Sequence, residues 1–161
     1  MSLSEEQISS LLRMTSAWVT RLAISGKSAE TDEKKFTSEV LLPQLQEFVN
    51  SLKKPELYVR GDGGPSVIPL VWNGISFFPD MSIVSSHEKY VAFEVKVLRD
   101  SDPGGSLSKA IGQTFLYRKL GYVSSFGIIF DLRVFNTSKK LNFNWSEKIL
   151  SVDNTEVHIL N

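Results

Sequence analysis

The 161-residue sequence contains no cysteine. This absence excludes disulfides, thiolate zinc sites, iron–sulfur clusters and a cysteine nucleophile. No apolar run reaches the ~18 residues that a membrane-spanning helix needs, so we do not expect a membrane protein. The first six residues lack the basic and then apolar layout of a secretory signal, so we expect a cytoplasmic protein.

The sequence also lacks an excess of charge, because 18 basic residues balance 18 acidic ones. A DNA-binding protein is usually basic, but a local basic patch is enough for binding. The balance therefore argues only against tight, indiscriminate binding of nucleic acid. Hydrophobic residues make up 42% and charged residues 22% of the chain, which are ordinary values for a globular protein. We expect a single domain over residues 1–161.

Two helices are predicted before the first strand. Ser4-Glu5-Glu6-Gln7 has the form of a capping box, and the apolar residues that follow at helical spacing predict a helix over 4–25. Thr31 can cap a second helix that runs to about residue 52. Pro43 is expected to kink or divide this second helix, because proline lacks the N–H of the helical hydrogen bond.

The middle of the sequence is predicted to be extended. Asn73-Gly74 is the strongest short hairpin signal in the chain. Apolar segments bounded by turn residues predict four strands, at 57–60, 67–72, 75–84 and 90–98.

A further helix and strand complete the expected core. Ser106 can cap a helix over 106–120, and a buried strand is expected at 124–130. Beyond it we expect a helix at 145–150 and a strand at 156–160. These elements predict a mixed α/β domain with an N-terminal helix, a core at about 31–131 and a C-terminal extension at 132–161.

Acidic side chains occupy facing positions on two of the predicted strands. A turn centred near His87 places Asp80 opposite Glu94, with Cβ atoms roughly 4.5–5.5 Å apart. Two carboxylates at this distance repel unless a cation lies between them, and oxygen ligands favour Mg²⁺ or Mn²⁺. Lys96 shares the face of Glu94 and could position a water or stabilise charge, as phosphodiester hydrolysis requires. A one-residue slip in register would separate the two carboxylates.

The spacing of these residues resembles a known family. Pro79-Asp80 followed by Glu94-x-Lys96 on adjacent strands is similar to the PD-(D/E)XK nuclease superfamily, which has a restriction-endonuclease-like αβββαβ core. Glu39 lies at the place of that family's helical glutamate. Gln113 and Tyr117 look like the Gln-x-x-x-Tyr pair of several branches. The resemblance covers roughly residues 31–130.

The resemblance implies a role for each matching residue. Asp80, Glu94 and the backbone carbonyl of Val95 would bind Mg²⁺, with Mn²⁺ as a substitute, and Lys96 would assist the attacking water. Glu39 would act through the water shell of the metal.

Other residues are expected to hold the substrate. By the resemblance, Gln113 and Tyr117 would support the site or contact the DNA backbone. Four basic residues are candidates for phosphate contacts at the border of the cleft: Arg60, Arg99, Lys109 and Arg118.

The resemblance thus implies a metal-dependent deoxyribonuclease of the endonuclease type, acting on duplex or branched DNA by direct attack of water. A homodimer or a larger complex would supply DNA affinity. Two other readings stay open. One is a catalytically silent module of the same fold that binds nucleic acid or a protein. The other is an unrelated α/β domain in which the acidic residues form a solvated sheet face. Glu33 and Glu47 compete with Glu39 for the role of the helical glutamate.

Overall fold

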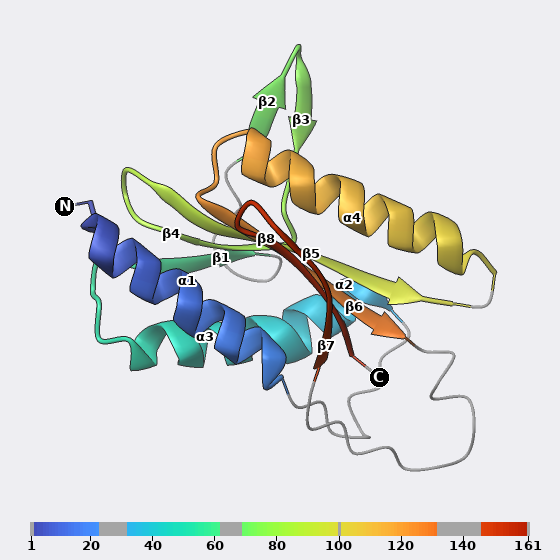
Figure 1. Ribbon diagram of the computed structural model, residues 1–161, viewed down its shortest axis with the longest axis horizontal. Helices are drawn as coiled ribbons and strands as arrows, with labels where there is room; N and C mark the ends of the chain where they lie inside the picture. The colour runs from blue at the N-terminus through green and yellow to red at the C-terminus, as the bar shows by residue number, and fades with distance from the viewer. Residues whose placement is uncertain (1, 23–31, 62–68, 100, 132–145, 161) are drawn as a thin grey trace.

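The computed structural model describes residues 2–22, 32–61, 69–99, 101–131 and 146–160, with only the backbone described at 146 and 147. Within these residues six strands form one sheet in the order β1-β4-β5-β6-β8-β7 (Figure 1). The strands are β1 (Tyr58–Gly61), β4 (Met81–Val84), β5 (Lys89–Leu98), β6 (Ser124–Asp131), β7 (Ser146–Val152) and β8 (Thr155–Leu160).

The sheet is mixed. β1, β4 and β5 are antiparallel neighbours, β5, β6 and β8 run parallel, and β7 is antiparallel to β8. Because β8 lies between β6 and β7, the described part of the C-terminal extension completes the sheet. The expectation of a mixed α/β fold around one sheet is therefore confirmed.

Helices cover both faces of the sheet (Figure 1). α1 (Glu5–Thr20) and α3 (Leu42–Ser51) pack on one face, where their apolar residues join the large core cluster that includes Phe93. α4 (Pro103–Lys119) packs on the other face. Side chains alternate along β5, so Phe93 points into the large core while Glu94 points to the side of α4.

The predicted capping box is confirmed at the start of α1. The Ser4 hydroxyl accepts a hydrogen bond from the Gln7 backbone N–H, and the Gln7 side chain accepts one from the Ser4 N–H. No helix among the described residues is long and apolar enough to cross a membrane.

The second helix is not divided at Pro43; a π-helical turn lies just before the proline instead. The helix consists of α2 (Glu33–Phe36), the π-helical turn η1 (Thr37–Leu41) and α3. The Leu42 N–H bonds to the carbonyl of Thr37, five residues back. The proline ring would clash with the carbonyl four residues before it, and the wider turn lets the chain continue without a break.

Three expected elements differ from the structure. The segment 75–84 is two strands, β3 (Ile75–Phe77) and β4, because Pro79 cannot donate to a sheet. α4 begins at Pro103 rather than at Ser106, since the Asp102 side chain caps the Gly105 N–H at 3.0 Å.

The expected helix at 145–150 is wrong. Residues 146–150 of this segment belong to β7, which forms a hairpin with β8, and residue 145 lies outside the described residues. Asp153 and Asn154 both adopt positive φ at the turn, at 50° and 57°, which these two residue types tolerate better than most. The pairing partner lies later in the chain, so local spacing alone did not identify the strand.

A pair of glycine substitutions tests how closely α4 approaches the sheet. A Cβ at Gly127 of β6 would lie 2.9 Å from Thr114 Oγ1 and 3.3 Å from the Val157 methyls, whereas at Gly112 it would meet nothing within 4 Å. We expect Gly127→Val to lower the free energy of unfolding by about 1–3 kcal/mol through overpacking. Gly112→Ala should raise it by roughly 0.5–1 kcal/mol. Urea unfolding followed by tryptophan fluorescence measures both free energies. A Gly127→Val variant as stable as the wild type would contradict the close packing of α4 on the sheet.

Candidate active site

The candidate site lies where β5 extends past the start of β4. β4 begins at Met81, so the backbone N–H groups of Val95 and Val97 have no strand partner on that edge. Two carboxylates replace the missing strand. Asp80 Oδ2 accepts from the Val95 N–H at 2.7 Å, and Glu33 Oε2 accepts from the Val97 N–H at 3.1 Å.

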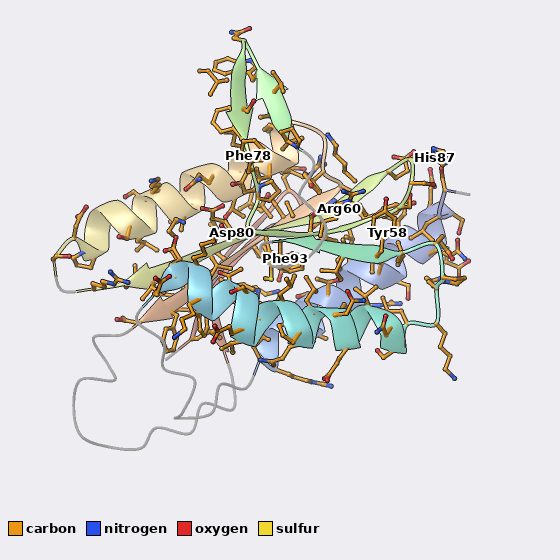
Figure 2. The ribbon with its side chains drawn as sticks, turned by 180° about the vertical axis from the view of Figure 1, so that it is seen from behind. Tyr58, Arg60, Phe78, Asp80, His87 and Phe93 are labelled. Atoms are coloured by element: carbon orange, nitrogen blue, oxygen red, sulfur yellow. The ribbon has the colours of Figure 1, made fainter. Side chains whose placement is uncertain are left out.

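The predicted register between these strands is confirmed. The pairing extends as far as Met81, which lies opposite Phe93. Asp80 follows just outside β4, where its N–H bonds to the Phe93 carbonyl at 3.0 Å and its carboxyl group lies near enough to Glu94 for that charge to raise its pKa. Figure 2 shows Asp80 above Phe93, inside the body of the protein. A β-bulge lies between Ile83 and Val84, on the turn side of the pair, and leaves this register unchanged.

The ammonium group of Lys96 is surrounded by oxygen atoms. Lys96 Nζ lies 2.8 Å from Glu94 Oε1, 2.8 Å from Glu33 Oε1 and 3.0 Å from the Val95 carbonyl. The Lys96 side chain is 12% exposed and that of Glu94 is 2% exposed, so these contacts lie largely out of water. Burial alone would lower the pKa of Lys96, but Glu94 and Glu33 outweigh burial and hold this pKa above its ordinary value. Lys96 is therefore a cation in the folded protein.

Tyr117 fixes the second oxygen of Glu94. Its hydroxyl donates to Glu94 Oε2 at 2.6 Å, and the Phe78 carbonyl, at 2.9 Å, is a second acceptor for the same proton. Burial first, and then the charge of Glu94, raises the pKa of Tyr117, so the hydroxyl keeps its proton. Gln113, one turn earlier on α4, lies near enough to this hydroxyl for its side chain to oppose the rise in the pKa of Tyr117. Gln113 and Tyr117 thus both reach the candidate site.

The carboxylates outnumber the cations at this place. Burial and the neighbouring Glu94 raise the pKa of Asp80 to about 7, against the Val95 N–H and Lys96, which lower it. Burial also raises the pKa of Glu94, although Lys96 and Tyr117 oppose this effect. With Glu33 the site holds three carboxyl groups and one ammonium group, an arrangement that an added cation would stabilise.

The structure brings Glu33, and not Glu39, to the site. Glu33 is in the first turn of α2 and contacts Lys96 and Val97, whereas Glu39 lies on η1 with an exposed side chain. Glu47 is also exposed, on α3. Helical phase alone could not separate these three glutamates. The useful signal was position, because the start of the helix lies beside the end of β5.

The expected phosphate-binding residues are spread over the surface. Arg99 lines a cavity of about 520 Å³ beside the site, together with Glu33, Lys34 and Ser106. Lys109 is exposed on α4.

The other two basic candidates lie apart from this cavity. Arg60 lies on β1 with its guanidinium 5.2 Å from the centre of the Tyr58 ring, as Figure 2 illustrates. Arg118 bonds to the carbonyls of Asp153 and Tyr122. Of the four, Arg99 is therefore the one that the structure places beside the carboxylates.

A metal ion at this site would need ligands of more than one kind. No group of three or more histidine, cysteine, aspartate or glutamate side chains in the described ranges is spaced to hold a metal. The oxygens that do converge are those around Lys96 Nζ, from Glu33, Glu94 and the Val95 carbonyl. They are hard donors of the type that Mg²⁺ and Mn²⁺ prefer, and water would complete the shell.

Comparisons with protein-family models, with curated proteins and with solved structures find no match to this chain. The fold and the site define a mixed α/β protein in which three carboxyl groups and one lysine gather beside β5, beyond the start of β4, with Glu94 buried and Glu33 37% exposed.

The raised pKa of Asp80 predicts a specific dependence of stability on pH. Its ordinary value is 3.8 and the folded value is about 7, so the folded state binds more protons than the unfolded state between these values. The free energy of unfolding then falls as the pH rises from about 4 to 7. Asp80→Asn removes this pH-dependent contribution to the free energy of unfolding, and the amide oxygen of the asparagine can still accept from the Val95 N–H.

In EDTA we expect Asp80→Asn to be more stable than the wild type at pH 8, by on the order of 1–3 kcal/mol. The difference should vanish towards pH 4. Urea unfolding across this pH range measures it, and a wild type that gains stability relative to the variant as the pH rises would contradict the raised pKa.

Proposed function

We propose that the protein is a metal-dependent nuclease that hydrolyses phosphodiester bonds of DNA. The observation that carries this proposal is the meeting of Asp80, Glu94, the Val95 carbonyl and Lys96 at one edge of the sheet. Buried acidic groups with shifted pKa values beside a charged lysine are typical of catalytic sites. The same set is what the resemblance to the PD-(D/E)XK superfamily implies.

The order of elements supports the proposal. A helix (α2 to α3), the strands β1, β4 and β5, then α4 and β6 follow one another, as in an αβββαβ core, with the hairpin of β2 (Leu70–Trp72) and β3 inserted after β1. Within this core β1, β4 and β5 are antiparallel, and β5 is parallel to β6. A restriction-endonuclease-like fold is therefore the fold that we propose.

By the resemblance, a divalent cation, Mg²⁺ or Mn²⁺, would be held by Asp80, Glu94 and the Val95 carbonyl, all of which offer hard oxygen donors. When bound, such an ion polarises a phosphate and acidifies a water molecule. Lys96, charged and largely desolvated, would hold the attacking water or stabilise the negative charge that develops on the phosphate. Tyr117 holds Glu94 Oε2, so that Oε1 stays directed towards Lys96.

Glu33 and Arg99 extend the site beyond the reacting atoms. Glu33 holds Lys96 Nζ and the Val97 N–H at once, so it sets the position of the lysine relative to β5. Arg99 lines the adjoining cavity and would contact a neighbouring DNA phosphate.

A silent binding module of the same fold is the second candidate. The observation in its favour is that Lys96 is ion-paired on two sides, as in a structural network. Such a module would bind nucleic acid or a protein without hydrolysis, so a cleavage assay separates the two candidates.

Cleavage of DNA tests the proposal directly. Supercoiled plasmid, linear duplex and branched DNA are incubated with the protein in Mg²⁺ or Mn²⁺, with EDTA as a control. We expect cleavage that needs the metal and that Lys96→Ala slows at least about 100-fold, because a charge stabiliser of the transition state is lost. Lys148→Ala is the matched control, since it removes a lysine ion-paired with Glu156 on β7 and β8, away from the site. Wild-type protein that binds DNA but cleaves none of it would favour the silent module.

The two helical glutamates provide a second, paired test. Glu33→Gln leaves Lys96 without one of its two carboxylate partners, so we expect a 10- to 100-fold slower cleavage, mainly through kcat. Glu39→Gln changes an exposed side chain of η1 and should leave the rate within about twofold of the wild type. The reverse pattern would show that Glu39, as the resemblance implies, acts in the reaction.

A further inference from the structure

The β2–β3 hairpin stands clear of the body of the protein. β2 (Leu70–Trp72) and β3 (Ile75–Phe77) pair with each other and not with the main sheet, and both views show them projecting beyond α4 (Figures 1 and 2). Asn73 and Gly74 close the turn with φ of 48° and 78°, which fixes a tight two-residue connection. The hairpin is therefore a defined projection.

One face of this hairpin is an apolar ladder of two rungs. Leu70 pairs with Phe77 and Trp72 with Ile75, and residues opposite each other share a face. The inner rung packs on the core cluster of Tyr117, since Leu70 is 2% exposed. The outer rung has no such cover, because Trp72 is 54% and Ile75 is 53% exposed. Apolar surface thus continues from the core to the tip.

The exposure of apolar side chains is concentrated here. Seven large apolar side chains are exposed among the residues that the structure describes, and four of them, Val71, Trp72, Ile75 and Phe78, lie within 70–78. This segment contains no charged residue. Surface apolar residues that gather in this way mark a binding surface.

The base of the hairpin is attached to the candidate site. The Phe78 carbonyl lies 2.9 Å from the Tyr117 hydroxyl, which donates to Glu94, and Asp80 follows two residues later. Figure 2 shows Phe78 where the hairpin joins the body, with Asp80 beyond it. The base of the hairpin therefore lies beside the candidate site.

The size of the surface argues against a protein partner. Four side chains that are each about half exposed offer on the order of a few hundred Å², because a whole buried aromatic residue covers roughly 150–250 Å². A stable protein interface needs about 800 Å² from each partner. A nucleobase step is a smaller target, and it accepts apolar and aromatic side chains between its flat faces.

We propose that the β2–β3 hairpin inserts Trp72 and Ile75 between nucleobases of the DNA beside the phosphodiester bond that the site cleaves. This inference rests on the proposed nuclease function and adds to it the class of substrate. Contacts between the hairpin and the bases offset the free-energy cost of unstacking. The hairpin therefore favours DNA in which a base step near the cut is unpaired or readily opened. Branched DNA then binds more tightly than a continuous duplex.

Binding in a cleavage-deficient background tests the inference. Lys96→Ala protein is titrated in Mg²⁺ against a fluorescein-labelled duplex and against a branched DNA of the same sequence, with anisotropy as the readout. Adding Trp72→Ala should raise the Kd for the branched DNA about 5- to 100-fold, the loss typical of one base–aromatic stack. Trp72→Phe should retain most of the affinity. Val152→Ala, which trims a side chain 52% exposed on β7, should change nothing.

The outcomes separate this inference from the proposed function. If Trp72→Ala leaves the Kd unchanged while the protein with native Lys96 cleaves DNA, the inference fails and the nuclease stands. If the protein neither binds nor cleaves any DNA, both fail. If sedimentation shows a dimer that Trp72→Ala dissociates without change in DNA affinity, the hairpin is a self-association surface and the inference is overturned. Circular dichroism of each variant checks that the fold is kept.

Discussion

Backbone hydrogen bonding at the free edge of β5 governs the arrangement of this protein. A buried N–H group needs an acceptor, and where β4 stops, β5 has no strand to supply one. Asp80 and Glu33 supply it with side-chain oxygens. Asp80 and Glu33 are therefore placed by the sheet itself, and Lys96 lies between Glu33 and Glu94, whose charges favour its ammonium group. The carboxylate groups that satisfy the backbone of β5 are thus also members of the candidate site.

Gathering carboxyl groups at one place lowers the stability of the folded protein. Burial first, and then repulsion from neighbouring carboxylates, raises the pKa of Asp80 and Glu94, because both effects disfavour the charged form. The backbone donors, Lys96 and Tyr117 offset part of this repulsion. Functional sites of proteins commonly lower the stability of the fold in this manner, because the interactions that a ligand would complete are left unsatisfied in the free protein.

The parts of this arrangement that depend on alternation were predictable from the sequence. Side chains alternate along a strand, so a short turn near His87 predicted the register of β4 with β5 and brought Asp80 near Glu94. Local chemistry also predicted the capping box at Ser4 and the turn at Asn73-Gly74, because each depends on residues within a few positions of one another.

The parts that depend on distant segments were not predictable. Glu33 is useful because the start of α2 comes to rest beside the end of β5, a contact over 63 residues of sequence. β7 is a strand because β8 pairs with it, and its own residues gave no clear indication. The strand expected at 75–84 is broken between β3 and β4, because Pro79 cannot donate to the sheet and the β2–β3 hairpin leaves it. The apolar residues on both sides of Pro79 made the segment look like one strand.

The π-helical turn before Pro43 has a consequence for the helix that precedes it. A π-helical turn accommodates one residue more than an α-helical turn, and each residue in a helix advances the phase by about 100°. α3 is held by its own packing on the sheet, so the extra residue in η1 sets the rotation of α2. In that rotation Phe36 points into the core and Glu33 points to β5. Loss of a single residue from η1 would turn both away, so the length of this segment is as constrained as its side chains.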